Sequence, residues 1–454
     1  MNDTLIVGAG PVGLFLAAEL KLQGHTPLII DRLERPTGLS KALGVQGGGV
    51  ALLEARGLLP LFKAEVMREG PVGLHFAGLP LDEPTAFLFV LQARVEAVLE
   101  AHLDSLGVRV QRGVALEDFE QRDDHVRVTL RAKGDVRTTE VRYLVGCDGA
   151  QSTVRTLAGI DFPGTEPTML LRLGDVRMPG ATLTSEGLLL PNGARAPFGV
   201  GVPIDDGYFR VVAREPYPPG FDRKAPFHLE ELQAALRRSF GFDIPVSEPR
   251  WLSRFTNAAR QAATYRKGRV LLAGDAAHIH LPAGGPGIGT GLGDAGNLAW
   301  RLSAVLGGHH PDTLLDGYHE ERHPAGARVL QHTQAQSALM TPGPHLPALR
   351  GLLGELLRVP EARRFVSRRV QGLDNHYGDD PNPLVGQWMP TPIDLRRGRF
   401  VLLLPSSLAF ENEWGERLEV RPGEQPLLIR PDGFVAWAGD GDIRTAVSRW
   451  LGRG

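Results

Sequence analysis

The sequence has a single cysteine, Cys147, among its 454 residues. One thiol excludes an internal disulfide, a Cys-x-x-Cys redox pair and a cysteine-rich metal site. Cysteine-poor chains are typical of reducing compartments, so we expect a cytoplasmic protein.

Long apolar runs are also missing. Residues 5–20 are largely apolar, but glycines interrupt the run, and it is shorter than the roughly 20 residues of a membrane span. Asp3 stands where a signal peptide would carry basic residues. We therefore expect neither a targeting segment nor a membrane partner.

Neither sign of charge dominates, because 50 Lys and Arg residues oppose 52 Asp and Glu residues. This balance argues against a nucleic acid or an anionic membrane as the main partner. The length predicts two or three domains around a large core.

A glycine-rich pattern, Gly-Ala-Gly-Pro-Val-Gly at 8–13, follows an apolar strand near the N-terminus, and residues 14–22 favour a helix. In a G-x-G-x-x-G turn, Gly8 permits the tight turn and Gly10 permits the close approach of a pyrophosphate. Gly13 permits the helix to pack on the strand. The pattern predicts a dinucleotide-binding turn.

The next strand supports this interpretation. Apolar residues 27–30 end at Asp31, and Arg32 follows. A carboxylate about 20 residues beyond the glycine turn is expected to bind a ribose. Arg32 could cover the adenine or a phosphate.

A second glycine-rich segment lies far downstream. The apolar run 270–273 ends in Gly274-Asp275, a glycine-rich loop follows, and residues 294–306 have helical character. A lone carboxylate at a strand end is well placed to accept hydrogen bonds from a sugar-like chain. Glycines let backbone N–H groups approach a flat or anionic ligand.

A third segment, 143–147, reads as a strand and ends in Asp148-Gly149, before a helix that starts near Ser152. Alone it is an ordinary strand, turn and capped helix. Together, the three segments resemble the flavoprotein aromatic hydroxylases, the single-component FAD monooxygenases similar to p-hydroxybenzoate hydroxylase. The resemblance covers residues 1 to 380.

The segments 250–255 and 318–324 resemble the rifampicin monooxygenase type and the aromatic polyketide hydroxylases. Residues 428–437 look like part of the thioredoxin-like C-terminal module of that subgroup. The resemblance implies that NADPH or NADH reduces FAD, that O2 then forms a flavin C4a-hydroperoxide, and that a phenolic, polyketide or antibiotic-like aromatic substrate is hydroxylated.

The resemblance also implies which residues contact FAD: Gly8, Gly10, Val12 and Gly13 at the pyrophosphate, Asp31 and Arg32 at the adenosine, Asp275 at the ribityl chain, Pro282, Gly285, Gly287, Ile288 and Gly289 at the isoalloxazine, and Lys41, Gln92, Asp148 and Gly274 elsewhere. For Gln92, an ordinary position at a helix start is an equally good interpretation.

The catalytic and substrate-side candidates are Pro282, His75, Phe76 and Arg210. Packed aromatic side chains and a solvated strand arginine are slightly better interpretations of the last three. His278 and His280 lie two residues apart, but no soft ligands accompany them, so we expect no metal.

Three positions depart from the family pattern. Pro286 removes an N–H, Gly289 replaces an asparagine, and Leu43 stands where members often carry arginine. These departures motivate an alternative, an FAD-binding protein of this family with little or no hydroxylase turnover. A flavin halogenase or reductase ranks below both because no halogenase signature is present.

The expected fold is α/β: an FAD-binding, Rossmann-like domain of the glutathione-reductase type, an inserted mixed β-sheet substrate domain and a C-terminal thioredoxin-like module. Substrate identity stays open, and the oligomeric state is expected to be a monomer or homodimer. The expected boundaries are 1–72, 93–166 and 265–380 for the FAD domain, 73–92 and 167–264 for the substrate domain, and 381–454 for the module.

Overall fold

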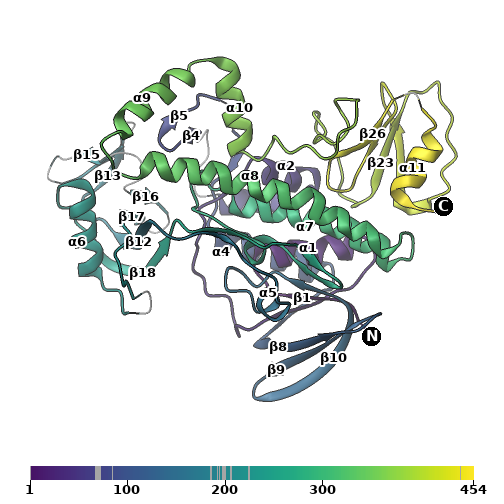
Figure 1. The fold of residues 1–454 in the computed structure, drawn as a ribbon, viewed down its shortest axis with the longest axis horizontal. Coiled ribbons are helices and arrows are strands. Elements are labelled where there is room, and N and C mark those ends of the chain that lie inside the picture. The colour runs from purple at the N-terminus through teal and green to yellow at the C-terminus, as the bar shows by residue number, and fades with distance from the viewer. Residues whose placement is uncertain are drawn as a thin grey trace. The chain divides into compact units, whose positions relative to one another are not determined.

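The computed structural model describes residues 2–66, 73–83, 85–184, 187–191, 193, 195–196, 201–204, 207–222, 225–439 and 441–453. The chain forms two compact units, and Figure 1 labels the helices and strands that build them. The first comprises Met1–Pro163, Arg260–Thr333 and Gly351–Gly454, and the second comprises Gly164–Ala259 and Gln334–Arg350. The boundary expected at residue 72 lies outside the described residues.

A largely parallel sheet forms the centre of the first unit, with the order β20-β21-β10-β1-β2-β7. Its strands are β1 (Asn2–Val7), β2 (Leu28–Asp31), β7 (Val110–Arg112), β10 (Asp135–Gly146), β20 (Arg266–Lys267) and β21 (Val270–Leu272). β8 (Val114–Gln121) and β9 (Val126–Ala132) extend β10 as an antiparallel hairpin. A parallel sheet needs both faces covered, which explains the continuous apolar runs of β1, β2 and β21.

The register of these strands places the three sequence segments at one edge. Val7 pairs with Gly146, and Gly146 pairs with Leu272. Because β1, β10 and β21 are parallel, the turns that follow them all leave the same carboxyl edge of the sheet. In open α/β sheets, ligands bind at this edge.

Helices α1 (Pro11–Leu22) and α7 (Gly287–Leu306) pack closely in the first unit. α1 has proline at its first position, where no N–H is needed. Its residues Leu14, Phe15 and Leu16 are fully buried. The sequence predicted α7 from Asp294, but the helix begins at Gly287, inside the expected glycine loop.

The glycines of α7 explain this difference. A Cβ on Gly291 would lie 2.4 Å from Cγ2 of Val12 on α1. The small residues therefore serve helix-to-helix approach. Glycine lowers intrinsic helix propensity, so a local interpretation favours a loop, but tertiary packing overrides that preference.

Shorter elements complete the first unit. Its other helices are α2 (Gly48–Ala55), α3 (Leu59–Phe62), α4 (Gln92–Ser105), α5 (Thr153–Leu157) and α10 (Pro360–Val370). Its other strands are β3 (Val45–Gln46), β4 (His75–Phe76), β5 (Leu79–Pro80), β6 (Phe87–Leu88) and β22 (His278–Ile279). The chain passes between the units at β11 (Gly164–Thr165), at β19 (Ala259–Gln261) and along α8 (Asp316–Met340) and α9 (Leu346–Leu356). Among the described residues, no helix is both long and apolar enough to cross a bilayer.

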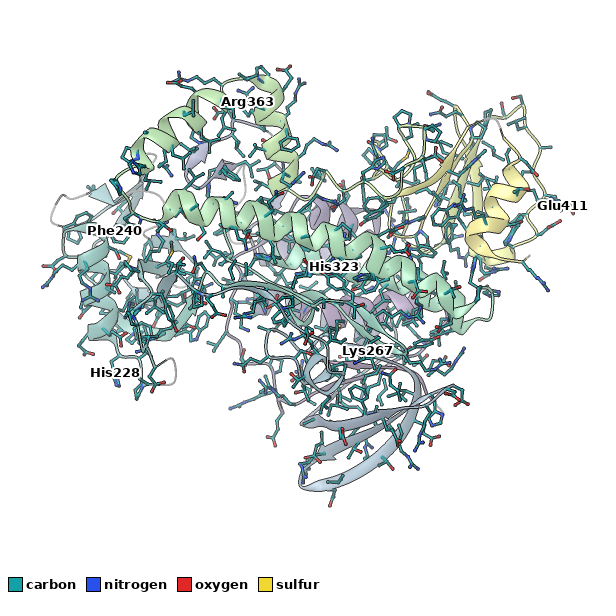
Figure 2. The ribbon with its side chains drawn as sticks, viewed as in Figure 1. His228, Phe240, Lys267, His323, Arg363 and Glu411 are labelled. Atoms are coloured by element: carbon teal, nitrogen blue, oxygen red, sulfur yellow. The ribbon has the colours of Figure 1, made fainter. Side chains whose placement is uncertain are left out.

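The second unit is built on an antiparallel sheet with the order β16-β17-β12-β18. Its strands are β12 (Met169–Arg177), β16 (Gly201–Pro203), β17 (Tyr208–Pro216) and β18 (Ser247–Thr256), and a smaller sheet holds β13 (Thr182–Thr184), β14 (Gly187–Leu189) and β15 (Arg195–Ala196). α6 (Leu229–Phe240) buries Leu232 and Leu236 against the sheet. Phe240, at the end of α6, packs against the same core (Figure 2).

The C-terminal part of the first unit has a four-stranded sheet of order β24-β23-β25-β26 and a closing helix. These elements are β23 (Phe400–Leu404), β24 (Leu418–Pro422), β25 (Leu427–Ile429), β26 (Val435–Ala438) and α11 (Ile443–Leu451). Trp300 of α7 is 2 % exposed and belongs to the apolar core of this part.

Buried charges join the C-terminal part to α7 and α8. Arg430 is fully buried and donates to both oxygens of Glu321, at 2.8 and 2.9 Å. Asp432 accepts hydrogen bonds from Asn297 and from the Trp300 indole. Burial favours the neutral form of Glu321, but the guanidiniums of Arg301 and Arg430 outweigh it and lower its pKa to about 2.

We predict that Glu321→Gln destabilises the protein at neutral pH by about 1.5–3 kcal/mol, the range for hydrogen bonds to a charged group. The contribution of a carboxylate with a lowered pKa is complete above its unfolded pKa and is lost as pH falls through the folded value. The difference in unfolding free energy between wild type and Glu321→Gln should therefore shrink between about pH 4.5 and pH 2. Urea titrations at several pH values measure it. Exposed Glu320→Gln is the control, and a difference that stays constant with pH would contradict the prediction.

Candidate functional site

The first turn of the sheet edge has the shape that the glycine pattern predicts. Gly8 has φ +105°, and a Cβ there would lie 2.4 Å from the carbonyl oxygen of Cys147. A Cβ on Gly13 would lie 2.0 Å from the carbonyl oxygen of Gly8. Beside Gly10, by contrast, no atom lies within 4 Å of such a Cβ. Two glycines therefore permit close packing, and the middle one faces open space.

Asp31 is oriented by backbone at the end of β2. Its Oδ2 accepts from the N–H of Ala9 at 2.9 Å, and its Oδ1 accepts from Leu33 at 2.8 Å. These bonds tie the carboxylate to the turn after β1. A carboxylate has about four lone-pair sites, so it can accept further hydrogen bonds from hydroxyl groups. Arg32, next to it, is exposed.

Asp148 serves the helix that follows it. Its Oδ2 accepts from the N–H groups of Thr153 and Val154 at 2.7 and 3.1 Å, and its Oδ1 accepts from the Ser152 hydroxyl at 2.5 Å. Ser152 in turn caps α5 by accepting from the N–H of Arg155. The Asp-Gly segment thus has a local structural role at the sheet edge.

Gly274 and Asp275 lie in a single 3-10 turn that follows β21. Asp275 is exposed, and within the described part of the chain its carboxylate makes no hydrogen bond. Gly274 has φ +63°, the left-handed region that favours glycine. A Cβ on Gly274 would lie 2.9 Å from Cγ2 of Val12, so this turn lies against the first turn of α1.

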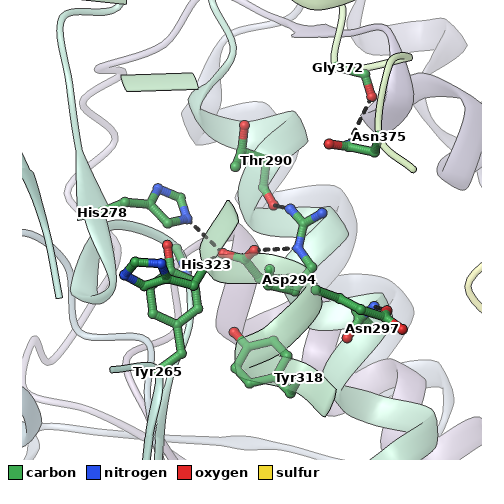
Figure 3. A network of polar contacts seen from close by, with 12 residues as sticks. Tyr265, His278, Thr290, Asp294, Asn297, Tyr318, His323, Gly372 and Asn375 are labelled. Carbon is green, nitrogen blue, oxygen red and sulfur yellow. Dashed lines mark hydrogen bonds and ion pairs between the residues drawn. The ribbon is translucent and has the colours of Figure 1, made fainter. Parts of the chain in front are cut away.

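A buried carboxylate accepts a hydrogen bond from the backbone of the Gly274-Asp275 turn. Asp294 on α7 is 0 % exposed and accepts from the N–H of Gly274 at 3.0 Å. His278 contacts the same carboxylate through Nε2 at 2.7 Å (Figure 3). Arg322 on α8 donates to Oδ1 at 2.8 Å and also to the Tyr377 hydroxyl at 2.7 Å. We refer to these residues as the Asp294 network.

Electrostatics keep Asp294 charged despite its burial. Burial favours the neutral acid, but Arg322 and His278 outweigh it, and the pKa of Asp294 is lowered. The contact with Asp294 also occupies one ring nitrogen of His278. Among the described residues, no three His, Cys, Asp or Glu side chains gather as a metal site.

The glycine-rich start of α7 lies against the start of α2. Gly285 has φ +70°, Pro286 precedes the helix, and Gly287 and Ile288 form its first turn. A Cβ on Gly49 would lie 2.7 Å from the Cα of Gly289. Pro282 precedes this region and donates no N–H.

Gln92 and Lys41 belong to a neighbouring part of the first unit. Gln92 accepts from the N–H of Ala42 through its side chain at 3.3 Å and donates its own N–H to the Ala42 carbonyl at 3.1 Å. It therefore ties the segment that carries Lys41 to the start of α4. Lys41 itself is exposed.

The substrate-side candidates occupy two units. His75 and Phe76 form β4 in the first unit, and Phe76 is buried. Arg210 lies on β17 in the second unit, 4 % exposed, and donates twice to Asp175 at 2.8 Å. The guanidinium of Arg210 also lies 5.2 Å from the ring of Trp251. Arg210 is thus a buried, paired residue and not a solvated strand arginine.

Sequence reasoning missed Asp294, Arg322 and Glu321. A signal was present, because Asp294 and Asn297 interrupt a stretch of α7 whose other residues are small or apolar. A polar residue at a buried position needs a partner. The partners could not be named, because they lie on α8 and on the segment after α10.

Comparison with known proteins identifies the family. The model of the FAD binding domain matches residues 1–333, and the model of the aromatic-ring hydroxylase C-terminal region matches residues 373–454. The chain belongs to the FAD-dependent aromatic-ring hydroxylases. This confirms the family indicated by the three sequence segments.

Several relatives align over the whole chain. The chain is 38 % identical to 12-dehydrotetracycline 5-monooxygenase/anhydrotetracycline 6-monooxygenase of Streptomyces rimosus, with 99 % of both chains covered. It is 38 % identical to rifampicin monooxygenase of Rhodococcus hoagii, over 100 % of this chain and 99 % of that one. A dialkyldecalin synthase of Streptomyces rugosporus is 39 % identical, with the same coverage.

A solved structure of an anhydrotetracycline hydroxylase from Streptomyces rimosus superposes with a TM-score of 0.87 at 36 % identity, covering 99 % of each chain. The protein is thus an FAD-dependent monooxygenase with a mixed α/β fold. FAD is its cofactor, and a nicotinamide nucleotide is the reductant, as is typical of this family.

We predict that Asp294→Asn destabilises the protein by about 3–5 kcal/mol, because it leaves the buried Arg322 without a carboxylate. The free energy of unfolding in urea, measured without added FAD, tests this. The exposed Asp135→Asn on β10 is the matched control. A loss equal to that of the control would show that the Asp294 network contributes nothing to stability.

Proposed function

We propose that the protein hydroxylates a phenolic, polyketide or antibiotic-like aromatic substrate, with FAD held along the carboxyl edge of the central sheet. One observation carries this proposal: the turns after β1, β10 and β21 leave the same edge. The tetracycline and rifampicin monooxygenases among the relatives support the substrate class. O2 is the expected co-substrate.

The open space beside Gly10 suits the pyrophosphate of FAD, with Gly8, Val12 and Gly13 shaping the turn. The first turn of α1 presents backbone N–H groups and the positive end of the helix dipole to that position. The carboxylate of Asp31, aimed by two backbone N–H groups, accepts from the ribose. Arg32 lies beside the adenosine.

Asp275 suits the ribityl chain, because its exposed carboxylate has unused acceptor capacity. The Asp294 network fixes the backbone of Gly274 and thereby the direction of Asp275. Gln92 and Asp148 act near the cofactor by holding the adjacent backbone, and their hydrogen bonds to the chain favour this indirect role over direct contact. Lys41, which is exposed, is retained as a candidate for direct contact with FAD.

The start of α7 suits the flavin ring. Gly285, Gly287, Ile288 and Gly289 place backbone at a helix N-terminus, whose partial positive charge stabilises negative charge on reduced flavin. Bound FAD would accept a hydride from the nicotinamide nucleotide and activate O2. Pro282 lies at the start of this loop and, as a proline, has no backbone N–H to donate.

His75, Phe76 and Arg210 are our candidates for substrate contact. Phe76 supplies an apolar surface, and the buried pair of Arg210 with Asp175 is neutral overall. We assign Arg210 a positioning role, because its Nε and Nη2 already donate to the two carboxylate oxygens of Asp175.

For the C-terminal part we propose a thioredoxin-like module without thiol chemistry. In its mixed sheet, β23 is parallel to β24 and antiparallel to β25. No cysteine lies beyond Cys147, so disulfide exchange there is impossible. The domain boundaries stated from the sequence, a cytoplasmic location and a monomeric or homodimeric state are retained as proposals.

Turnover is the test of the function. We predict that the FAD-loaded protein oxidises NADPH or NADH faster when a hydroxylatable polycyclic phenol is added, and that the phenol gains one oxygen atom. Absorbance of the reduced nucleotide and product mass measure the two effects. Oxidation without any oxygenated product across a panel of phenols would favour the alternative, an FAD-binding protein with little turnover.

The position of FAD is tested at Asp275. We predict that Asp275→Ala weakens FAD binding by about 1–3 kcal/mol, or roughly five- to 150-fold in Kd, because it removes a charged acceptor. Titration of apoprotein with FAD measures the constant, and Asp135→Ala is the control. An unchanged Kd would contradict the assignment of Asp275.

A further inference from the structure

A cavity lies behind the first turns of α7, within the first unit. Its volume is about 60 Å³, which is room for a few water molecules. Its walls come from the starts of α2 and α7, from α8 and from residues 369–375. Of the residues proposed to hold FAD, only Gly289 lines it. The cavity is therefore adjacent to the proposed FAD site and shares one residue with it.

Three arginines line this cavity, and two of them have a carboxylate partner. Arg322 is paired with Asp294, and Arg369 is paired with Asp374. Arg328, on α8, has no such partner among the described residues. The remaining carboxylate of the lining, Asp432, is paired with Arg430 and accepts from α7.

The donors of Arg328 are incompletely used. Its Nη2 donates to Oδ1 of Asn375 at 2.9 Å. Its Nε is buried and finds no acceptor in the described part of the chain. Burial lowers the pKa of Arg328, Asp374 opposes that effect, and the nearby Arg369 adds to it. An unpaired buried donor next to other cations calls for an acceptor that carries negative charge.

The two helix starts beside the cavity both carry a partial positive charge. α2 begins at Gly48 and α7 begins at Gly287, and their first turns touch at Gly49 and Gly289. Thr290 of α7 and Asn375 of the segment after α10, both labelled in Figure 3, belong to the residues that line the cavity. Two helix starts and one guanidinium without an ion-pair partner among the described residues thus border the same small space.

We propose that this cavity binds a small monoanion, either an inorganic anion or the carboxylate of a small metabolite, on the Nε–H of Arg328. Such an anion would link α8 to residues 369–375 and to the first turn of α7. It would thereby hold the back of the loop that we assign to the flavin ring. Binding itself does not rest on the proposed function, because no FAD contact other than Gly289 takes part.

Bromide is the probe for the test. In crystals of the FAD-loaded protein grown with sodium bromide, we expect an anomalous peak within hydrogen-bond distance of Arg328 Nε. In solution, bromide should raise the thermal midpoint, and Arg328→Gln should raise the half-effective bromide concentration about tenfold, the effect of losing one charged hydrogen bond. Arg328→Lys, which keeps the charge, should recover part of the response.

Exposed Arg127→Gln is the control for general salt effects. Loss of the bromide peak on soaking in sodium acetate would assign the site to carboxylates, and its persistence would assign it to inorganic anions. Asp275→Ala should keep the bromide response, which separates this proposal from the FAD assignment. No peak at Arg328, an equal salt response of Arg328→Gln and Arg127→Gln, or flavin density inside the cavity would each overturn the proposal.

Discussion

The buried carboxylate of Asp294 is the interaction on which the site depends most. It connects the turn after β21 with two long helices, through Gly274, His278 and Arg322. A charge at a fully buried position is expensive unless several donors satisfy it. Because three donors converge there, the carboxylate determines where the Gly274-Asp275 turn stands relative to α7. The exposed Asp275 can then point away from the core, and among the described residues its carboxylate has no hydrogen-bond partner.

The same principle joins the C-terminal part to the first unit. Glu321 lies one residue before Arg322 on α8, so adjacent residues of one helix serve two buried networks. Through Arg430 and Asp432, the C-terminal part reaches Asn297 and Trp300 on α7, the helix that also carries Asp294. A change in the packing of the C-terminal part would therefore alter the packing of α7. This arrangement gives a module without cysteines a structural purpose.

Much of the site could be predicted because its signals are local. The turn at Gly8, the acid at Asp31 and the pair Gly274-Asp275 each follow directly from a strand, and parallel strands bring such turns to one edge. The start of α7 could not be predicted in the same way. Its glycines read as a loop, whereas Gly291 is small because Val12 of α1 lies against it.

The remaining residues were hidden for a related reason. Arg322 lies 28 positions after Asp294, and Tyr377 lies a further 55 positions after Arg322. No short stretch of sequence therefore contains the network. Arg210 shows the opposite error, because a solvated side chain is the ordinary interpretation of an arginine on a strand, and its burial became visible only with Asp175 beside it. Spacing along the chain reports secondary structure well, but it reports charge pairing across the fold poorly.

Arg328 differs from the buried arginines that form ion pairs. Arg56 is paired with Glu19, Arg210 with Asp175, Arg322 with Asp294 and Arg430 with Glu321. In each pair an interior guanidinium meets a carboxylate, as desolvation demands. Arg328 lines a cavity and keeps a buried N–H without an acceptor from the described chain. In these four pairs the fold itself supplies the carboxylate, whereas the buried N–H of Arg328 is left for an acceptor from solution, as we propose.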